Sequence, residues 1–169
     1  VLGGRFADKG LIIVRATDEA AVRAQLAQDP SIVAGTFQAA VDEYRPFYHG
    51  DTKPAAPAAS TASAAPATPM KNFLIVLRPV ARLHDDKAWT AADNALVGQH
   101  FNRLKEATAR GQVILAGRTD ESGDKTFGLV IISAANEAAA REFMNGDPAV
   151  AGGIMTATLH PYGIALRAK

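Results

Sequence analysis

Cysteine is absent from the 169 residues of the chain. This absence excludes a disulfide framework, a thiol nucleophile and any metal site with cysteine ligands. Long apolar runs are missing too, because the longest covers only residues 73–77 and a bilayer span needs about 20 residues. No signal peptide is visible, so we expect a cytoplasmic protein. The sequence opens on Val1 and not on Met, which suggests that upstream residues have been lost.

Charge of one sign is not in excess either. The 18 Lys and Arg residues nearly balance the 17 Asp and Glu residues and are scattered along the chain. A nucleic-acid-binding protein usually gathers its positive charge in a patch, so we expect neither a nucleic-acid nor a membrane partner. Phosphate-binding glycine motifs, nucleophile elbows and metalloprotease signatures are missing as well. We therefore expect a small-molecule substrate or ligand, with no metal and no cofactor.

One segment separates two parts of different composition. Residues 51–69 read DTKPAAPAASTASAAPATP and contain no large apolar side chain. Such a segment cannot bury enough surface to offset its ordering entropy, which predicts a linker without regular structure. The linker divides the chain into residues 1–50 and residues 70–169.

The two parts are related in sequence. With a shift of 118 positions, residues 10–44 align without a gap with residues 128–162, and 13 of the 35 positions are identical. Upstream, VLGGR at residues 1–5 matches ILAGR at residues 114–118. An internal repeat of this kind predicts two modules of one fold.

The second part has the pattern of a complete module. Strands are predicted at residues 73–77, 112–118, 127–133 and 156–162, and helices at residues 91–110 and 136–144. The order βαββαβ is the ferredoxin-like pattern of an α+β protein. Its helices cover one sheet face, and both faces of the third strand are apolar, so we expect the other face to pack on the sheet of another module.

The first part is a partial module. It contains counterparts of the second strand, third strand, second helix and last strand, but no counterpart of the first strand and first helix. The missing strand would lie in the middle of the sheet, so its absence leaves apolar edges unpaired. We expect that upstream residues or another chain fill this gap.

His100 is the first candidate for chemistry. On a helical wheel it lies within the apolar face, between Leu96 and Leu104. A titratable ring at such a position points toward the sheet or into a pocket under the helix. The alternative is a core histidine whose ring bonds a backbone carbonyl, and the sequence by itself favours this alternative.

Asp147 is the second candidate. It precedes Pro148, and Asp followed by Pro is typical of a helix N-cap and first turn. Asp29-Pro30 repeats the pair in the first part, which fits a structural cap as well as catalysis. In a βαββαβ fold the His100 helix and the Asp147 turn lie on the same side of the sheet, where the carboxylate would orient the ring.

Other polar residues are weaker candidates. Arg118 and its counterpart Arg5 end matching strands and are candidates for binding an anionic substrate, although the sequence favours a solvated strand end for both. His160 lies in a strand and aligns with Asp42 rather than with a histidine. His84, with Asp85 and Asp86, is better read as a polar loop than as a metal site.

These features together resemble the YCII-related (YciI-like) proteins. The resemblance rests on the helical His100, the strand end Gly117-Arg118, the hairpin and the segment DPAVAGG at residues 147–153. It covers nearly all of residues 70–167 and the corresponding part of residues 1–48. It implies ferredoxin-like modules that pair as a dimeric α+β barrel, within this chain or between chains, and a pocket shared by His100 and Asp147. In the partial copy only Asp29 would remain of that pair.

Two functions follow as hypotheses. In the first, the protein is an enzyme of the lyase or isomerase type, in which His100 is the general acid or base and Asp147 orients it. In the second, it is a non-catalytic ligand-binding or assembly module, in which both residues are structural. A haem-binding barrel with an axial histidine is a third hypothesis.

Overall fold

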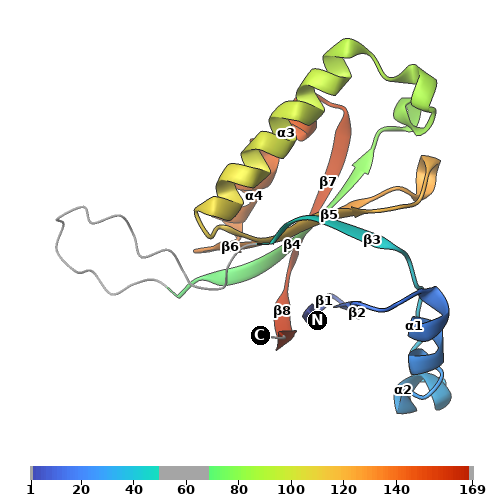
Figure 1. The fold of residues 1–169 in the computed structure, drawn as a ribbon. Coiled ribbons are helices and arrows are strands. Elements are labelled where there is room, and N and C mark those ends of the chain that lie inside the picture. Colours follow the sequence, from blue (N-terminus) through green and yellow to red (C-terminus); the bar gives the residue numbers. More distant parts are fainter. Residues whose placement is uncertain (1, 50–68, 168–169) are drawn as a thin grey trace.

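The computed structural model describes residues 2–49 and 69–167 and has an α+β fold with two antiparallel sheets (Figure 1). The predicted linker therefore lies, apart from Pro69, outside the described residues. Within them no helix is both long and apolar enough to cross a membrane. The strands and helices are, in order, β1 (Leu2–Phe6), β2 (Lys9–Ile13), α1 (Glu19–Leu26), α2 (Pro30–Val33), β3 (Tyr44–His49), β4 (Lys71–Pro79), η1 (Ala81–His84), η2 (Asp86–Ala88), α3 (Ala91–Ala109), β5 (Val113–Thr119), η3 (Gly123–Lys125), β6 (Gly128–Ala134), α4 (Glu137–Asn145), α5 (Pro148–Ala151), β7 (Met155–Pro161) and β8 (Gly163–Arg167).

The larger sheet has five strands in the order β3-β5-β6-β4-β7, and all neighbours are antiparallel. Four of the strands follow the linker in sequence, and β3 precedes it. Helices α3 and α4 lie together on one face of this sheet (Figure 1). Apolar side chains from both helices and the strands form the core under them, including Phe73, Ile75, Leu104, Val130, Ile132 and Phe143.

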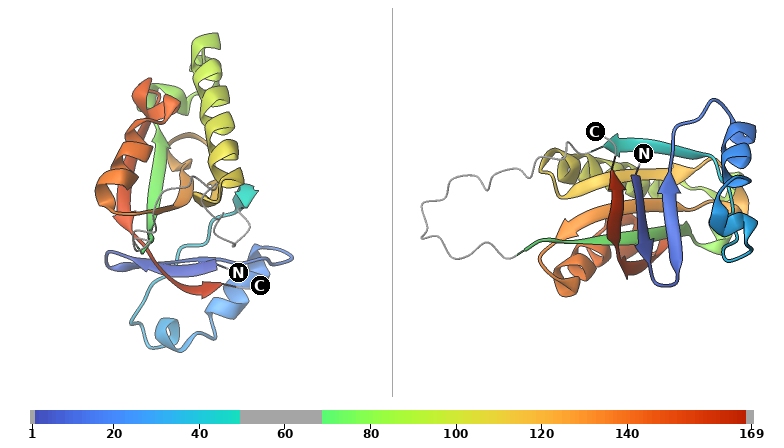
Figure 2. Two further views of the ribbon diagram at one scale, coloured as in Figure 1. Left: turned by 90° about the vertical axis from the view of Figure 1, so that its left-hand side faces the viewer. Right: turned by 90° about the horizontal axis from the view of Figure 1, so that it is seen from below.

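The smaller sheet has three strands in the order β2-β1-β8. It lies across the other face of the five-stranded sheet, as the two views of Figure 2 show. A second core joins the two sheets; it contains Leu74, Leu115, Leu129, Ile131 and Tyr162 from or next to the larger sheet and Leu2, Phe6, Leu11 and Ile13 from the smaller one. The sheet face away from α3 and α4 is therefore covered by strands of the same chain.

Helices α1 and α2 extend away from both sheets (Figure 1) and bury none of their residues. The last strand of the first part also differs from the repeat. The repeat predicts that residues 37–43 match β7, but these residues have no regular structure and β3 begins only at Tyr44. The physical reason is that β7 pairs only with β4, and nothing in the described residues supplies a counterpart of β4 to residues 37–43.

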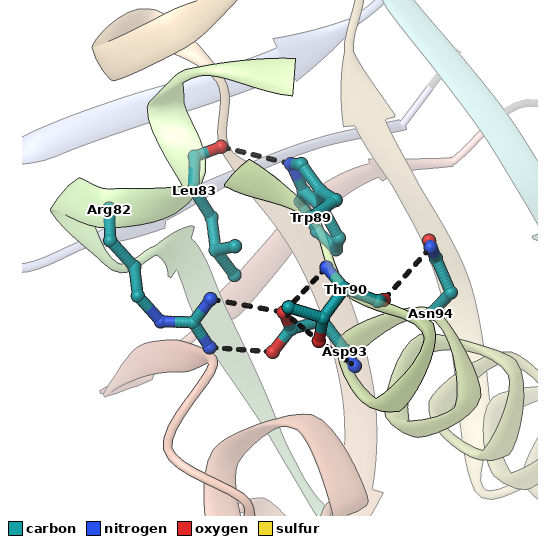
Figure 3. A network of polar contacts seen from close by, with 6 residues as sticks. All are labelled: Arg82, Leu83, Trp89, Thr90, Asp93 and Asn94. Carbon is teal, nitrogen blue, oxygen red and sulfur yellow. Dashed lines mark hydrogen bonds and ion pairs between the residues drawn. The ribbon is translucent and has the colours of Figure 1, made fainter. Parts of the chain in front are cut away.

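A capping network holds the start of α3 in place (Figure 3). The Thr90 hydroxyl accepts from the Asp93 N–H at 3.2 Å, and Asp93 Oδ2 accepts from the Thr90 N–H at 2.9 Å, which makes a capping box. The Arg82 guanidinium donates to both Asp93 oxygens, at 2.5 and 3.0 Å. The hydrogen bond from Arg82, and to a smaller extent the one from Thr90, lower the pKa of Asp93. This buried carboxylate fixes the helix seven residues before His100.

Gly98 lies inside α3, and a Cβ at this position would meet nothing within 4 Å. Glycine in a helix interior costs about 0.5–1 kcal/mol relative to alanine, because the unfolded chain gains more backbone freedom. We expect the Gly98→Ala variant to be more stable by about this amount. Urea unfolding followed by circular dichroism measures the difference, and a lower midpoint for the variant would contradict the expectation.

Candidate functional site

His100 and Asp147 are in direct contact, although they are 47 residues apart in sequence. His100 Nδ1 lies 2.9 Å from Oδ1 and 2.8 Å from Oδ2 of Asp147. A carboxylate can only accept, so the ring donates its Nδ1–H. Both side chains are buried, with 6% of each exposed. Helix α3 supplies the histidine from its sheet-facing side, and the turn between α4 and α5 supplies the aspartate.

Asp147 is also the N-cap of α5. Its Oδ1 accepts from the Ala149 N–H at 3.0 Å, and Pro148 occupies the first helical position. An aspartate followed by proline favours this local geometry, because the side chain satisfies a free N–H and the ring presets the helical backbone. The cap fixes the carboxylate from one side while His100 meets it from the other. The structural and the orienting roles of Asp147 are therefore compatible.

Several contacts act on the ionisation of Asp147. Burial by itself raises its pKa, whereas the His100 hydrogen bond and charge, the Ala149 N–H and the Arg103 charge lower it. The contacts outweigh the burial, so the pKa of Asp147 lies below its usual value. The carboxylate is thus held as an anion beside the ring.

Arg103 is a third member of the site that the sequence analysis missed. Its Nη1 lies 3.4 Å from Asp147 Oδ2, and its Nη2 donates to the Phe143 carbonyl at 2.7 Å. The guanidinium also stacks over the Phe143 ring, at 4.1 Å from the ring centre. Arg103 follows His100 by three positions on α3, and this spacing, which places two side chains on one helix face, is the signal that would have found it.

The second ring nitrogen of His100, Nε2, is not used in the contact with Asp147. Within the described residues Nε2 of His100 makes no hydrogen bond, and it is not among the fully enclosed polar atoms that lack a partner. Next to Asp147 lies a cavity of about 10 Å³, lined by this residue and by apolar side chains of α3, α4 and the sheet, but not by His100. This volume holds about one water molecule.

The arrangement of helices around this pair can be compared with known families. Residues 79–159 match the family model of the YCII-related domain. The match covers 81 of the 169 residues, from the end of β4 into β7, and includes both His100 and Asp147. Residues 1–78 and 160–169 lie outside the match. No curated protein and no solved structure matches the chain significantly.

The lowered pKa of Asp147 predicts how stability depends on pH within the YCII-related domain. A carboxyl whose folded pKa lies below its unfolded value of 3.8 stabilises the fold above that value. The contribution is lost as pH falls from about 4 through the lower folded pKa. We expect the stability gap between the wild type and Asp147→Asn to be constant above about pH 5 and to shrink below about pH 4. Urea unfolding across this range, with Asp124→Asn as an exposed control, measures the gap; a gap that widens in acid would contradict the assignment.

The other predicted site residues lie apart from the pair. Arg118 lies on β5 with an exposed side chain, and within the described residues no hydrogen bond or ion pair joins it to His100 or Asp147. Its role in substrate binding stays a prediction. Asp29 caps α2 as Asp147 caps α5, accepting from the Ser31 N–H at 2.8 Å, but it is exposed, and among the described residues no histidine bonds to it.

The remaining candidates have structural contacts. The His160 ring lies 5.2 Å from the Phe6 ring, between the two sheets. His84 Nε2 donates to the Pro79 carbonyl at 3.2 Å. Arg5 is exposed on β1. In the parts of the chain that the structure describes, no group of three or more His, Asp and Glu residues could hold a metal ion.

Proposed function

We propose that His100 and Asp147 form an acid–base pair that moves a proton on a small molecule, in a reaction of the lyase or isomerase type. The observation that carries the proposal is the contact of Nδ1 with both carboxylate oxygens, at 2.8 and 2.9 Å, which leaves Nε2 without a partner among the described residues. A ring oriented in this way has the geometry of a general base.

Each residue has a separate role in the proposed reaction. Nε2 of His100 takes a proton from a carbon next to a carbonyl group, and the electron pair of the broken C–H bond forms an enolate. Asp147 stabilises the positive ring that results, and Arg103 holds Asp147 in place. Return of the proton to a different atom completes an isomerisation, and loss of a leaving group from the neighbouring carbon completes an elimination.

A non-catalytic module is the second candidate, and one observation favours it. The cavity beside Asp147 holds only about one water molecule and is not lined by His100, so a substrate would have to open the space between α3 and α4. In this second function the pair would tie α3 to the start of α5, and the barrel would bind a ligand elsewhere or only assemble.

Proton exchange on carbon tests the proposal without a known substrate. A panel of small cyclic ketones and lactones is incubated with the protein in D₂O, and NMR follows the loss of the proton next to the carbonyl. We expect the protein to accelerate the exchange of at least one compound. In parallel, carbethoxylation of the native protein is read by mass spectrometry, and we expect modification of His100 at Nε2. No acceleration together with an unmodified His100 would overturn the proposal and favour the non-catalytic module.

We also propose that the chain is a tandem of two ferredoxin-like modules, one partial, that pair as an intrachain pseudo-dimer. Two strand pairings support this. β3 pairs with β5 so that Pro46 faces Gly117 and Arg45 faces Arg118. β8 pairs with β1 so that Ile164 faces Gly4 and Gly163 faces Arg5, which are the matching positions of the repeat. In each module, the strand at the C-terminal end thus pairs with the second strand of the other module: β3 pairs with β5, and β8 pairs with β1.

Local structure repeats as well. The N-caps Asp29 and Asp147 have φ, ψ angles of −68°, 123° and −72°, 130°. Gly35 and Gly153, which follow them by six residues, both have positive φ, at 69° and 71°. Such backbone angles favour glycine, so the same turn is specified in both copies.

A further inference from the structure

An aromatic side chain lies directly beside the ring of His100. The ring of Phe101, the next residue on α3, has its centre 5.4 Å from the centre of the His100 ring, and the two planes are inclined by 58°. Asp147 bonds the same histidine ring at Nδ1. The proposed base therefore has a carboxylate on one nitrogen and a half-buried aromatic ring as its neighbour.

A second aromatic ring comes from the first part of the chain, before the linker. Phe47 of β3 meets Phe101 edge to face, with 5.2 Å between the ring centres and 83° between the planes. Edge-to-face packing at this distance is a favourable aromatic geometry. β3 contacts α3 and lies outside the residues that match the YCII-related domain. A row of three rings therefore runs from His100 to a strand of the other part of the chain.

Phe47 is the extra residue of a β-bulge. The register of β3 on β5 shifts between Pro46 and Tyr48, so within the described pairing Phe47 has no partner residue on β5. A bulge turns one side chain out of the regular alternation of a strand, and bulges are common next to active sites. Here the side chain at the bulge is the one that contacts Phe101. The backbone irregularity and the aromatic contact therefore occur at the same residue.

The bulge by itself does not require an aromatic side chain. β8 pairs with β1 with the same kind of shift, and the extra residue there, between Ile164 and Leu166, is Ala165. Ala165 is also the counterpart of Phe47 when the shift of 118 positions is continued. Phe47 is 43% exposed, so its ring is not needed to fill a core. Neither strand pairing nor core packing therefore explains the phenylalanine at this position.

We propose that Phe47 and Phe101 form an apolar wall beside His100 against which the substrate packs, and that Phe47 determines which substrate is accepted. This inference rests on the acid–base function proposed above. Two aromatic side chains offer a flat apolar surface, so the wall favours a carbonyl compound that carries a flat apolar ring over a small saturated one. The first part of the chain thus supplies a specificity-determining residue to the His100 site, which is complete only when both parts are folded together.

Two ketones that differ by one flat ring test the proposal. 2-Indanone is cyclopentanone with a fused benzene ring, and the proton exchange of each in D₂O is followed by NMR relative to its uncatalysed rate. We expect Phe47→Ala to lower the acceleration for 2-indanone by about tenfold, the effect of losing one aromatic contact, and to leave cyclopentanone unchanged. Phe47→Tyr keeps the ring and should keep the wild-type preference. Phe37→Ala, which removes another exposed aromatic ring, is the matched control and should change neither rate.

Binding of 2-indanone is measured separately from exchange. Aromatic ¹H–¹³C spectra follow its titration into the wild type and into Phe47→Ala. We expect saturable shifts of the Phe101 ring signals and a Kd about tenfold weaker in the variant.

The possible failures are distinguishable. An unchanged acceleration for 2-indanone in Phe47→Ala would overturn this inference and leave the acid–base function standing. An equal loss for both ketones would overturn it too, because Phe47 would then only support the fold. If neither ketone is accelerated, the acid–base function loses support and the binding arm decides on the wall. Phe101 shifts that Phe47→Ala weakens would support the wall, and their absence would overturn it.

Discussion

The His100→Gln variant is expected to lose the catalysed proton exchange by about 100- to 10,000-fold, the usual contribution of a general base. Glutamine has about the length of histidine and can still donate to Asp147, but it cannot accept a proton at the position of Nε2. The Asp147 carboxylate keeps Arg103 and the Ala149 N–H as partners, so the fold is retained. The measurement is the exchange rate of the best compound of the panel in D₂O.

His84→Gln is the matched control for this experiment. His84 is half-buried, its ring hydrogen-bonds only the Pro79 carbonyl among the described residues, and glutamine can make that bond. We expect the control to exchange at the wild-type rate. Equal proton-exchange rates for the wild type and His100→Gln would show that His100 takes no part in the reaction.

The second large effect concerns two glycines, Gly117 and Gly4, which occupy equivalent positions in the proposed pseudo-dimer. A Cβ at Gly117 would overlap the Arg45 carbonyl oxygen and lie 2.6 Å from the Tyr44 hydroxyl. A Cβ at Gly4 would overlap the Gly163 carbonyl oxygen and lie 2.6 Å from the Tyr162 hydroxyl. In each case backbone is in the way, so the neighbouring strand must move as a whole.

We therefore expect Gly117→Ala and Gly4→Ala each to lower the free energy of unfolding by about 3 kcal/mol or more, the upper end for overpacking. Urea unfolding measures both, with Gly10→Ala as a control, because its Cβ would meet nothing nearer than 3.9 Å. A large loss at Gly117 without one at Gly4 would show that the two junctions are not equivalent, and the tandem proposal would fail.

Most of the secondary structure could be predicted from local sequence patterns. The apolar runs at residues 73–77 and 127–133 predicted β4 and β6 to within a few residues. Strand propensity and burial depend on residues that are close together in the sequence, so a local pattern is enough to predict them. The Asp147-Pro148 pair predicted the start of α5 for the same reason. The helix predicted to end at residue 110 ends at Ala109, before the positive φ of Gly111.

Long-range pairing could not be predicted in the same way. The contact of His100 with Asp147 was expected from the βαββαβ order, which places both on one side of the sheet, and from the family resemblance, since no local rule joins residues 47 positions apart. β8 was missed because residues 163–167 become a strand only by pairing with β1. Residues 37–43 were expected to match β7 but have no strand partner in the described structure, so the same sequence pattern gave a different outcome.

The state of the His100 ring tests the central claim most directly. If His100 is the base, its neutral ring carries the proton on Nδ1, donated to Asp147, and leaves Nε2 unprotonated. Long-range ¹H–¹⁵N correlation spectra of the wild type identify which ring nitrogen carries the proton, and the His100→Gln spectrum assigns the signals. The account predicts a protonated Nδ1 and a bare Nε2, with the preference weakened in Asp147→Asn. A proton on Nε2 in the neutral ring of the wild type would contradict it.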